Sequence, residues 1–366
     1  MPESDSLLIP ALSALVLRQA KRSLIEHRII TGVSQKQNMP IGLQPEDRKA
    51  MALVSRACLA NGLPDHGAEI HHLLSLCSKP LGNWLSVPEV MEQGLESVCL
   101  IYKEEGLPTE EAEDLAGSFS TLTANLEEQL FSNLHDALAK QPKTLAEEYY
   151  TLIRDFVVRN PMTTEAVLHE KGKEMPAIIW KILNQLYESV PESWAIDGKV
   201  PVCGHCGNAM KQGKASLVCR LEACSATHPS KKIRRAAEPG ELIRAKRGVR
   251  KYWIEPGLDE ILLYDNLLAM GIEAQLYPHQ DRVDVAVGDI GIDLKAYASP
   301  ETLGNKFKKS LGGLHYYPEK WVVIPNRFIK VTPSYLERLV FAMERPNVVC
   351  LTVSDAIHHF RVQANA

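Results

Sequence analysis

Asp284, Asp293 and Lys295 lie in one stretch of alternating apolar and polar residues, from 282 to 295. Alternation with a period of two is typical of half-buried β-strands, and the Gly288-Asp289 pair between the two runs is typical of a two-residue hairpin turn. In such a hairpin Asp284 faces Asp293 on the adjacent strand. Lys295 points to the same side, because residues two apart share a face.

Two carboxylates that oppose each other on adjacent strands, with Cβ atoms about 5 Å apart, repel unless a cation lies between them. Such oxygen ligands suit Mg²⁺ or Mn²⁺, which prefer carboxylates, water and phosphate oxygens. A nearby lysine could orient an attacking water or stabilise charge that develops on a phosphate. The alternative is a solvated hairpin face with ordinary surface charges.

The elements around this hairpin alternate between helix and strand. A helix is predicted from Pro256 to Gly271, and Glu260 lies on its apolar face, so it should point inward. The further expected elements are a short strand (274–277) before the hairpin and, after it, a helix that follows Pro300, a strand (320–324), a helix (333–343) and a strand (348–353).

Over about residues 245–360, these acids and this order of elements resemble the PD-(D/E)XK nuclease superfamily, the fold of many restriction endonucleases. Asp284 matches the first acid, Asp293 and Lys295 match the (D/E)-x-K element, and Glu260 resembles the additional acid of the first helix. Val283 stands where the family usually has proline. The resemblance implies an Mg²⁺- or Mn²⁺-dependent endodeoxyribonuclease in which the three acids bind the ion and Lys295 completes the catalytic set.

Four cysteines form a second group with ligand chemistry: Cys203, Cys206, Cys219 and Cys224, spaced C-x₂-C-x₁₂-C-x₄-C. Two close pairs of thiolates suit tetrahedral Zn²⁺, and four cysteine ligands leave no open position, so the predicted zinc is structural. The pattern is similar to a zinc ribbon. A redox C-x-x-C motif or a coincidence of spacing is the alternative.

The net charge of −4 hides a local basic block. Between Lys199 and Glu255 there are thirteen Lys and Arg against four Asp and Glu, while the rest of the chain has 28 against 41. Such a block, with aromatic neighbours, fits contact with a nucleic-acid backbone, although a solvated surface is the alternative. Together with two lysines of the helix after Pro300, the predicted nucleic-acid-binding residues are Lys231, Lys232, Arg234, Arg235, Arg247, Arg250, Lys306 and Lys309.

The first half of the chain carries helical periodicity but no catalytic spacing. The expected helices are 7–17, 47–61, 68–77, 88–102, 109–139, 145–158 and 165–169, with a further one from 175 to 190. The last three could form a winged-helix or helix-turn-helix module, or any other three-helix segment.

We therefore expect an α+β multidomain protein with a mixed sheet in its nuclease core. The predicted domains are a helical scaffold or interaction region (1–144), a helical, winged-helix-like region (145–198), the zinc ribbon with a basic linker (199–240) and the nuclease domain (241–366). The sequence has no export signal and no membrane segment, so a cytoplasmic location is expected.

Together, these parts resemble the restriction-endonuclease-like (REase-like) protein associated with Piwi-related pPIWI-RE proteins in prokaryotic defence systems. The resemblance implies cleavage of phage or plasmid DNA, with Piwi-like and helicase partners; a homodimer is a further expectation. One alternative is a nucleic-acid-binding adaptor that keeps the fold without cutting, and another is a structure-selective repair nuclease. The sequence leaves the choice between DNA and RNA open.

Overall fold

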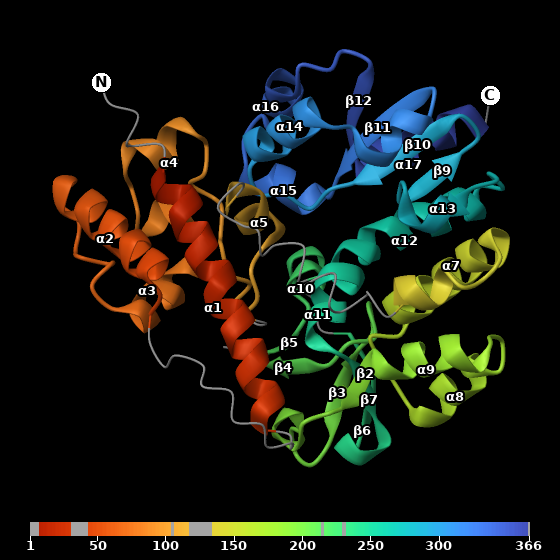
Figure 1. Ribbon diagram of the computed structural model, residues 1–366. Helices are drawn as coiled ribbons and strands as arrows, with labels where there is room; N and C mark the ends of the chain where they lie inside the picture. Colours follow the sequence, from red (N-terminus) through yellow and green to blue (C-terminus); the bar gives the residue numbers. More distant parts are fainter. Residues whose placement is uncertain are drawn as a thin grey trace. The chain divides into compact units, whose positions relative to one another are not determined.

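The computed structural model describes residues 7–30, 43–103, 106–116, 134–213, 216–228 and 232–364; for 21–30 and Arg247 it describes only the backbone. The chain forms two compact units (Figure 1). One contains residues 1–126, 297–309 and 337–344, and the other contains 127–296, 310–336 and 345–366. No helix within the described ranges has the length and apolar character needed to cross a membrane.

The first unit is helical, with a large apolar core and a small second cluster of Ala14, Leu17 and Ala116. Its N-terminal helices are α1 (Leu8–Ile30), α2 (Pro45–Ala60), α3 (Ile70–Cys77), α4 (Pro88–Glu92) and α5 (Glu110–Ala116), with a 3₁₀ turn η2 (Leu81–Asn83). The helix predicted over 88–102 is wrong beyond Glu92, because Gly94 takes a left-handed φ of 65° and ends it. Most of the predicted helix 109–139 lies outside the described residues.

Two segments from late in the sequence complete this unit and bring in helix α14 (Pro300–Lys309) and part of α16 (Tyr335–Met343). The buried Glu111 carboxylate accepts the backbone N–H groups of Ala298 and of Ser299, the latter at 3.1 Å. Burial raises the pKa of Glu111 to about 7. Arg338 also donates to Glu301 at 2.7 Å, so polar contacts hold both late segments.

The second unit opens with a small module of helices and strands. It contains α7 (Lys143–Arg159), β1 (Met162–Thr163), α8 (Glu165–Gly172), α9 (Ala177–Gln185), β2 (Tyr187–Ser189) and β7 (Ile243–Ala245). The strand order β1-β7-β2, with antiparallel pairing, is the order expected of a winged helix. The helix predicted to reach residue 190 is wrong at its end, because Tyr187–Ser189 pair with β7 as a strand.

The cysteine-rich segment is inserted between β2 and β7, where a winged helix has its wing. Here β3 (Val200–Cys203) pairs with β6 (Ile233–Ala237), and β4 (Met210–Gln212) pairs with β5 (Leu217–Cys219). Short helices flank these strands: η4 (Glu192–Trp194), α10 (Glu222–Thr227) and η5 (Pro239–Glu241).

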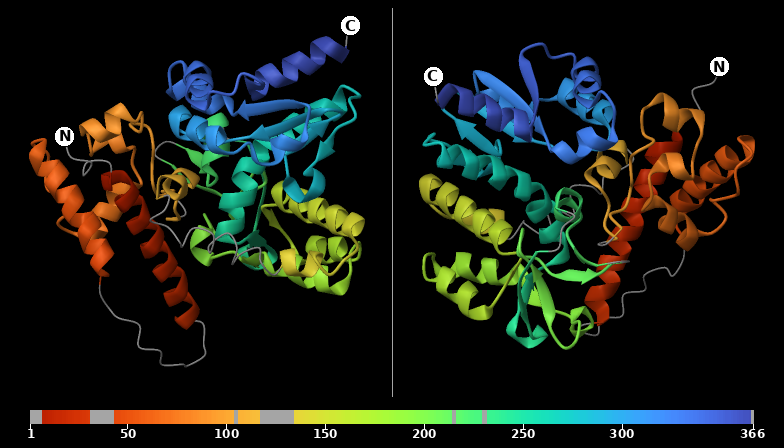
Figure 2. Two further views of the ribbon diagram at one scale, coloured as in Figure 1. Left: turned by 45° about the horizontal axis from the view of Figure 1, so that its top comes forward. Right: turned by 180° about the vertical axis from the view of Figure 1, so that it is seen from behind.

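A five-stranded mixed sheet of order β12-β11-β10-β9-β8 forms the rest of the unit (Figures 1 and 2). Its strands are β8 (Gln275–Leu276), β9 (Val285–Val287), β10 (Ile290–Leu294), β11 (Glu319–Ile324) and β12 (Val348–Thr352). The first three pair antiparallel, and β10, β11 and β12 pair parallel. The structure is therefore mixed α/β, as expected.

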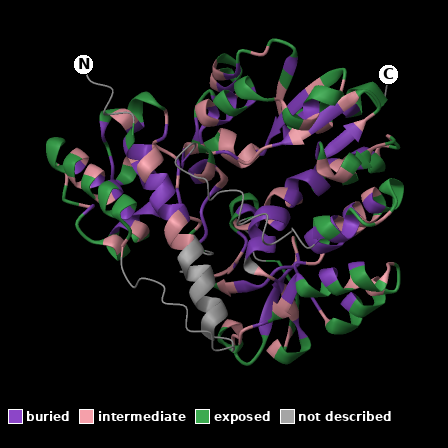
Figure 3. Cartoon of the chain, viewed as in Figure 1, coloured by how far each residue is buried: buried purple, intermediate pink, exposed green. Residues whose placement is uncertain are grey.

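Helices α12 (Glu255–Ala269) and α17 (Val353–Ala364) contact each other and the strands of this sheet. Figure 3 shows these strands as largely buried. The remaining short elements are α11 (Arg247–Val249), η6 (Arg250–Ile254), α13 (Pro278–Asp281), η7 (Gly312–Tyr316) and α15 (Asn326–Val331).

Candidate active site and cysteine cluster

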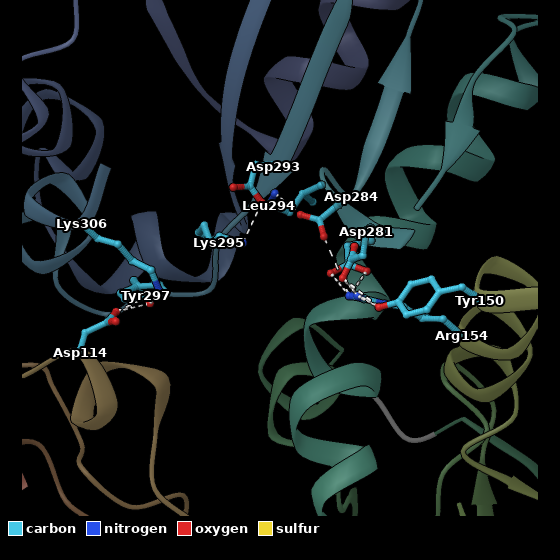
Figure 4. Close-up of polar contacts among 11 residues, drawn as sticks. Asp114, Tyr150, Arg154, Asp281, Asp284, Asp293, Leu294, Lys295, Tyr297 and Lys306 are labelled. Carbon is cyan, nitrogen blue, oxygen red and sulfur yellow. Dashed lines mark hydrogen bonds and ion pairs between the residues drawn. The ribbon is translucent and has the colours of Figure 1, made fainter. Parts of the chain in front are cut away.

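The β9–β10 hairpin has the predicted register. Val287 pairs with Ile290, and Val285 pairs with Ile292, which places Asp284 just before β9 and Asp293 near the end of β10. The ladder ends at Val285: the Asp284 backbone N–H, just before β9, donates to the Ile292 carbonyl at 3.1 Å, one residue out of the hairpin register. The hairpin thus brings the Asp284 and Asp293 carboxyls close enough to interact, one from just before β9 and the other from β10 (Figure 4).

Both carboxyls are withdrawn from water. One oxygen of Asp284 accepts the backbone N–H of Leu294 at 2.6 Å. Burial, followed by the charge of Glu260, raises the pKa of Asp284 to about 6. Burial raises the pKa of Asp293 to about 6 as well, against the opposing effect of Lys295. Crowded, partly protonated acids of this kind are what a hard cation ligated by oxygen would relieve, so the donor set fits Mg²⁺ or Mn²⁺.

Lys295 follows β10 and turns back to its acidic neighbour. Its Nζ lies 2.7 Å from Asp293 Oδ1, and its side chain is partly exposed. The Lys295 backbone N–H donates to the Val323 carbonyl at 3.0 Å, so the neighbouring strand β11 fixes the position of this residue. An ammonium group is therefore beside the acid pair and within reach of solvent.

Glu260 is inward-pointing, as predicted, but its partner is an arginine that the sequence analysis missed. Arg154 of α7 donates through one nitrogen to both Glu260 carboxylate oxygens, at 3.1 and 3.2 Å. The same guanidinium binds Asp281 and lies 3.9 Å from Asp284 Oδ1. Burial is the largest single effect and opposes the charge on Arg154, but Glu260 and the other negative or acidic groups around it together hold the pKa of the guanidinium well above its ordinary value.

Asp281 is presented to Arg154 by a segment with rare backbone geometry. Tyr277, His279, Gln280 and Asp281 all have positive φ, between 51° and 71°. Residues other than glycine seldom adopt this backbone conformation, and those that do cluster at functional sites. The Tyr277 ring also lies under the Arg154 guanidinium, with 4.2 Å from Cζ to the ring centroid. No local sequence pattern marks this pairing, because the partners lie more than a hundred residues apart.

The cysteine cluster has the predicted composition. Among the residues that the structure describes, Cys203, Cys206, Cys219 and Cys224 are the one set of at least three Cys, His, Asp or Glu whose ligand atoms all lie within 4.8 Å of one another. The backbone N–H of His205 points to Cys203 Sγ at 3.5 Å, which is typical of a zinc knuckle. Hydrogen bonds among the thiols lower the pKa of Cys203 and raise the pKa values of Cys206 and Cys219. The set fits Zn²⁺.

The predicted nucleic-acid-binding residues divide into several groups. Lys232, Arg234 and Arg235 are exposed on or beside β6. Arg250 is a correction: it is buried and donates to the Ala245 carbonyl at 2.6 Å, because it lies in the packed π-helical turn before α12. Lys231 lies outside the described residues, as does the side chain of Arg247.

Lys306 and Lys309, also predicted, are exposed on α14 in the first unit. The Lys306 ammonium lies 3.2 Å from an Asp114 oxygen and 2.6 Å from the Tyr297 hydroxyl, which itself donates to Asp114 (Figure 4). Lys306 therefore contributes to the packing of the first unit.

Comparison with family models gives two matches. Residues 257–364 match the family described as REase associating with pPIWI_RE. Residues 32–164 match pPIWI_RE three-gene island domain Y. Comparisons with curated proteins and with solved structures gave no match. Both descriptions associate the matched segments with pPIWI_RE, a Piwi-related protein, and the REase match indicates a nuclease-like role in defence.

Proposed function

Because this chain is an REase-like protein of the pPIWI-RE type, carrying the REase and Y segments in one polypeptide, we propose that it is a metal-dependent endonuclease of the PD-(D/E)XK superfamily. The observation that carries the proposal is the approach of the Asp284 and Asp293 carboxyls at one end of the β9–β10 hairpin, with Lys295 beside them, inside the REase match. The substrate we propose is DNA of phages or plasmids.

Asp284 and Asp293 are the ligands that we propose for one Mg²⁺ or Mn²⁺ ion. When bound, the ion makes water a stronger acid and offsets phosphate charge. Lys295 orients the water for attack and stabilises the negative charge that develops on the phosphate. Its own ion pair with Asp293 keeps the ammonium aimed at that place. The buried setting strengthens each of these electrostatic effects.

The winged-helix-like module offers a surface for duplex DNA. On α9, one face is exposed and carries Lys181, Asn184 and Gln185, while Ile179 and Leu183 are buried on the other. Lysine, asparagine and glutamine are side chains that read base edges in the major groove. The exposed basic residues of β6 belong to the inserted wing and add contacts to phosphates.

The four cysteines hold the wing through a structural Zn²⁺ in this proposal. The donor set is closed, so the zinc takes no part in hydrolysis. The Y segment and the pPIWI_RE association support a role beside a Piwi-related protein, and a helicase is a further proposed partner.

The test is to incubate the zinc-loaded protein with plasmid DNA, linear duplex, single-stranded DNA and RNA, with Mg²⁺, with Mn²⁺ or with EDTA. Cleavage of DNA that requires the divalent ion is expected, together with its loss in Lys295→Ala. Lys330→Ala, at an exposed position of α15, is the matched control and should cut normally. Tight binding to DNA without cleavage under any condition would instead support the non-cleaving adaptor. Preference for branched DNA would support a repair nuclease.

A further inference from the structure

The Arg154 guanidinium lies in the middle of an acidic group that the proposed nuclease site only partly uses. Its contacts are to Glu260, to Asp281 and, more distantly, to Asp284. Arg154 belongs to the segment that matches domain Y, whereas all three acids belong to the segment that matches the REase family. One matched segment thus supplies a buried cation to the acids of the other.

Arg154 is much closer to Glu260 than to Asp284, and this difference decides which acid can bind a metal ion. Both oxygens of Glu260 accept hydrogen bonds from it, whereas the nearest Asp284 oxygen is 3.9 Å away. Figure 4 shows the Asp284 side chain extending toward Arg154 and Asp281. Asp293 and Lys295 lie on the side of Asp284 that is away from Arg154. Arg154 therefore engages Glu260 fully but leaves the Asp284–Asp293 pair open to another cation.

Arg154 is also fixed in place. Its side chain is 6% exposed, the Tyr277 ring stacks on it, and the left-handed segment 277–281 supplies Asp281 as a further anion. Removing one member of a buried ion pair leaves an uncompensated charge away from water, so a divalent ion does not readily displace such an arginine. The guanidinium is a permanent part of the centre.

We propose that Arg154 is a positioning residue that withholds Glu260 from the catalytic ion, so that Asp284 and Asp293 alone supply the acidic ligands. The inference rests on the proposed function and assigns Glu260 a role different from that expected by family resemblance. It also makes the Y segment an integral part of the nuclease centre, because α7 carries the residue that sets the ligand number.

The test is Mn²⁺ affinity, measured by titration calorimetry on folded, zinc-loaded protein without DNA. Glu260→Gln should change the dissociation constant by no more than about twofold while Arg154 is present, because the carboxylate is not a ligand. In an Arg154→Met background, Glu260→Gln should change the Mn²⁺ dissociation constant by about fivefold or more, because Glu260 is then able to bind the ion. Arg154→Lys, which keeps a cation there, should again make Glu260→Gln silent.

A tenfold or greater loss of Mn²⁺ affinity in Glu260→Gln with Arg154 present would overturn the inference and leave the proposed nuclease intact. Equal Mn²⁺ affinity in Asp293→Asn and unmodified protein would overturn the proposed function, and this inference with it. If Arg154→Met does not fold, the Glu260→Gln and Arg154→Lys proteins still decide the question.

Discussion

The cysteine cluster and the acid pair are two candidate metal centres that differ in their ligands and in the charges around them. The four thiols lie close together and form a closed set of ligands that fits Zn²⁺, which would hold the surrounding strands. The acids Asp284 and Asp293 lie on a sheet that has its own core, and nearby cations, Lys295 and Arg154, already balance part of their charge. We therefore expect folding to depend on the first metal and chemistry on the second.

The largest effect should come from breaking the sulfur centre. Cys219→Ser removes one of four zinc ligands and should abolish zinc binding, at a cost of several kcal/mol that lowers Tm by roughly 10 °C. Zinc content by elemental analysis and Tm by calorimetry measure this. Cys350→Ser is the matched control, because Cys350 lies on β12 outside the cluster, and it should keep its zinc. Equal zinc content in both variants would refute the ribbon assignment.

Substituting one acid of the pair should have the opposite effect: it should weaken Mn²⁺ binding and leave zinc binding unchanged. Asp293→Asn removes a charged ligand and should weaken Mn²⁺ binding by about 100-fold, or ~2.7 kcal/mol, while zinc content stays unchanged. Calorimetric titration with Mn²⁺ measures the loss. Asp289→Asn, in the exposed turn of the same hairpin, should bind Mn²⁺ normally. A comparable loss in both variants would indicate a general charge effect.

The raised pKa values of Asp284 and Asp293 make the stability of the fold depend on pH. Asp284 and Asp293 titrate near 6 in the folded chain, above the ordinary value of 3.8. The folded state therefore holds more protons than the unfolded state between these values, and stability falls as pH rises from about 4 to 6. Asp293→Asn removes one such group, so it should be stabilising above pH 6 by an amount on the order of 1–2 kcal/mol. Denaturation at pH 4 and pH 7 checks this: a gain that is equal at both pH values would contradict it.

The rate of metal-dependent cleavage should also depend on the protonation of Asp284 and Asp293, but it should rise with pH where stability falls. Cation binding requires both acids to be deprotonated, so the rate at limiting Mn²⁺ should rise by roughly 10- to 100-fold per pH unit below 6 and level off above it. Rate profiles from pH 5 to pH 8 measure this. A rate that is flat across pH 6 would exclude these acids as ligands.

The smallest effects are expected at the surface of the wing and of α9. Lys181→Ala should weaken duplex binding severalfold, by roughly 1 kcal/mol, and reduce its salt dependence. Anisotropy titrations at several salt concentrations measure both, with Lys173→Ala, at the exposed position just after α8, as control. If the two variants bind equally, α9 is not the helix that contacts DNA.

Local pattern predicts the parts of the molecule that local physics determines. The hairpin register follows from alternation and the Gly288-Asp289 turn, and the cysteine cluster follows from ligand spacing. Arg154 could not be found this way, because its approach to Glu260 depends on the packing of α7 against distant elements. The same holds for segment 297–309, whose attachment to α5 in the first unit rests on contacts between residues far apart in the sequence.

The short strand β2 is a third feature that the local sequence does not predict. Residues 187–189 continue an apolar helical pattern, and only their pairing with β7, more than fifty residues later, makes them a strand. Tertiary pairing overrides local propensity at such positions. The resemblance to the restriction-endonuclease fold gave Glu260 a place near the acids, but the identity of its partner required the structure.

The central claim is that Asp284 and Asp293 hold a divalent ion for phosphodiester cleavage. The most direct measurement is the initial rate of plasmid cleavage against Mn²⁺ concentration, for zinc-loaded unmodified protein and for Asp293→Asn. A saturable rise is expected for the unmodified protein, and no cleavage above background is expected for Asp293→Asn. Cleavage that persists in EDTA, or equal rates for the two proteins, would contradict it.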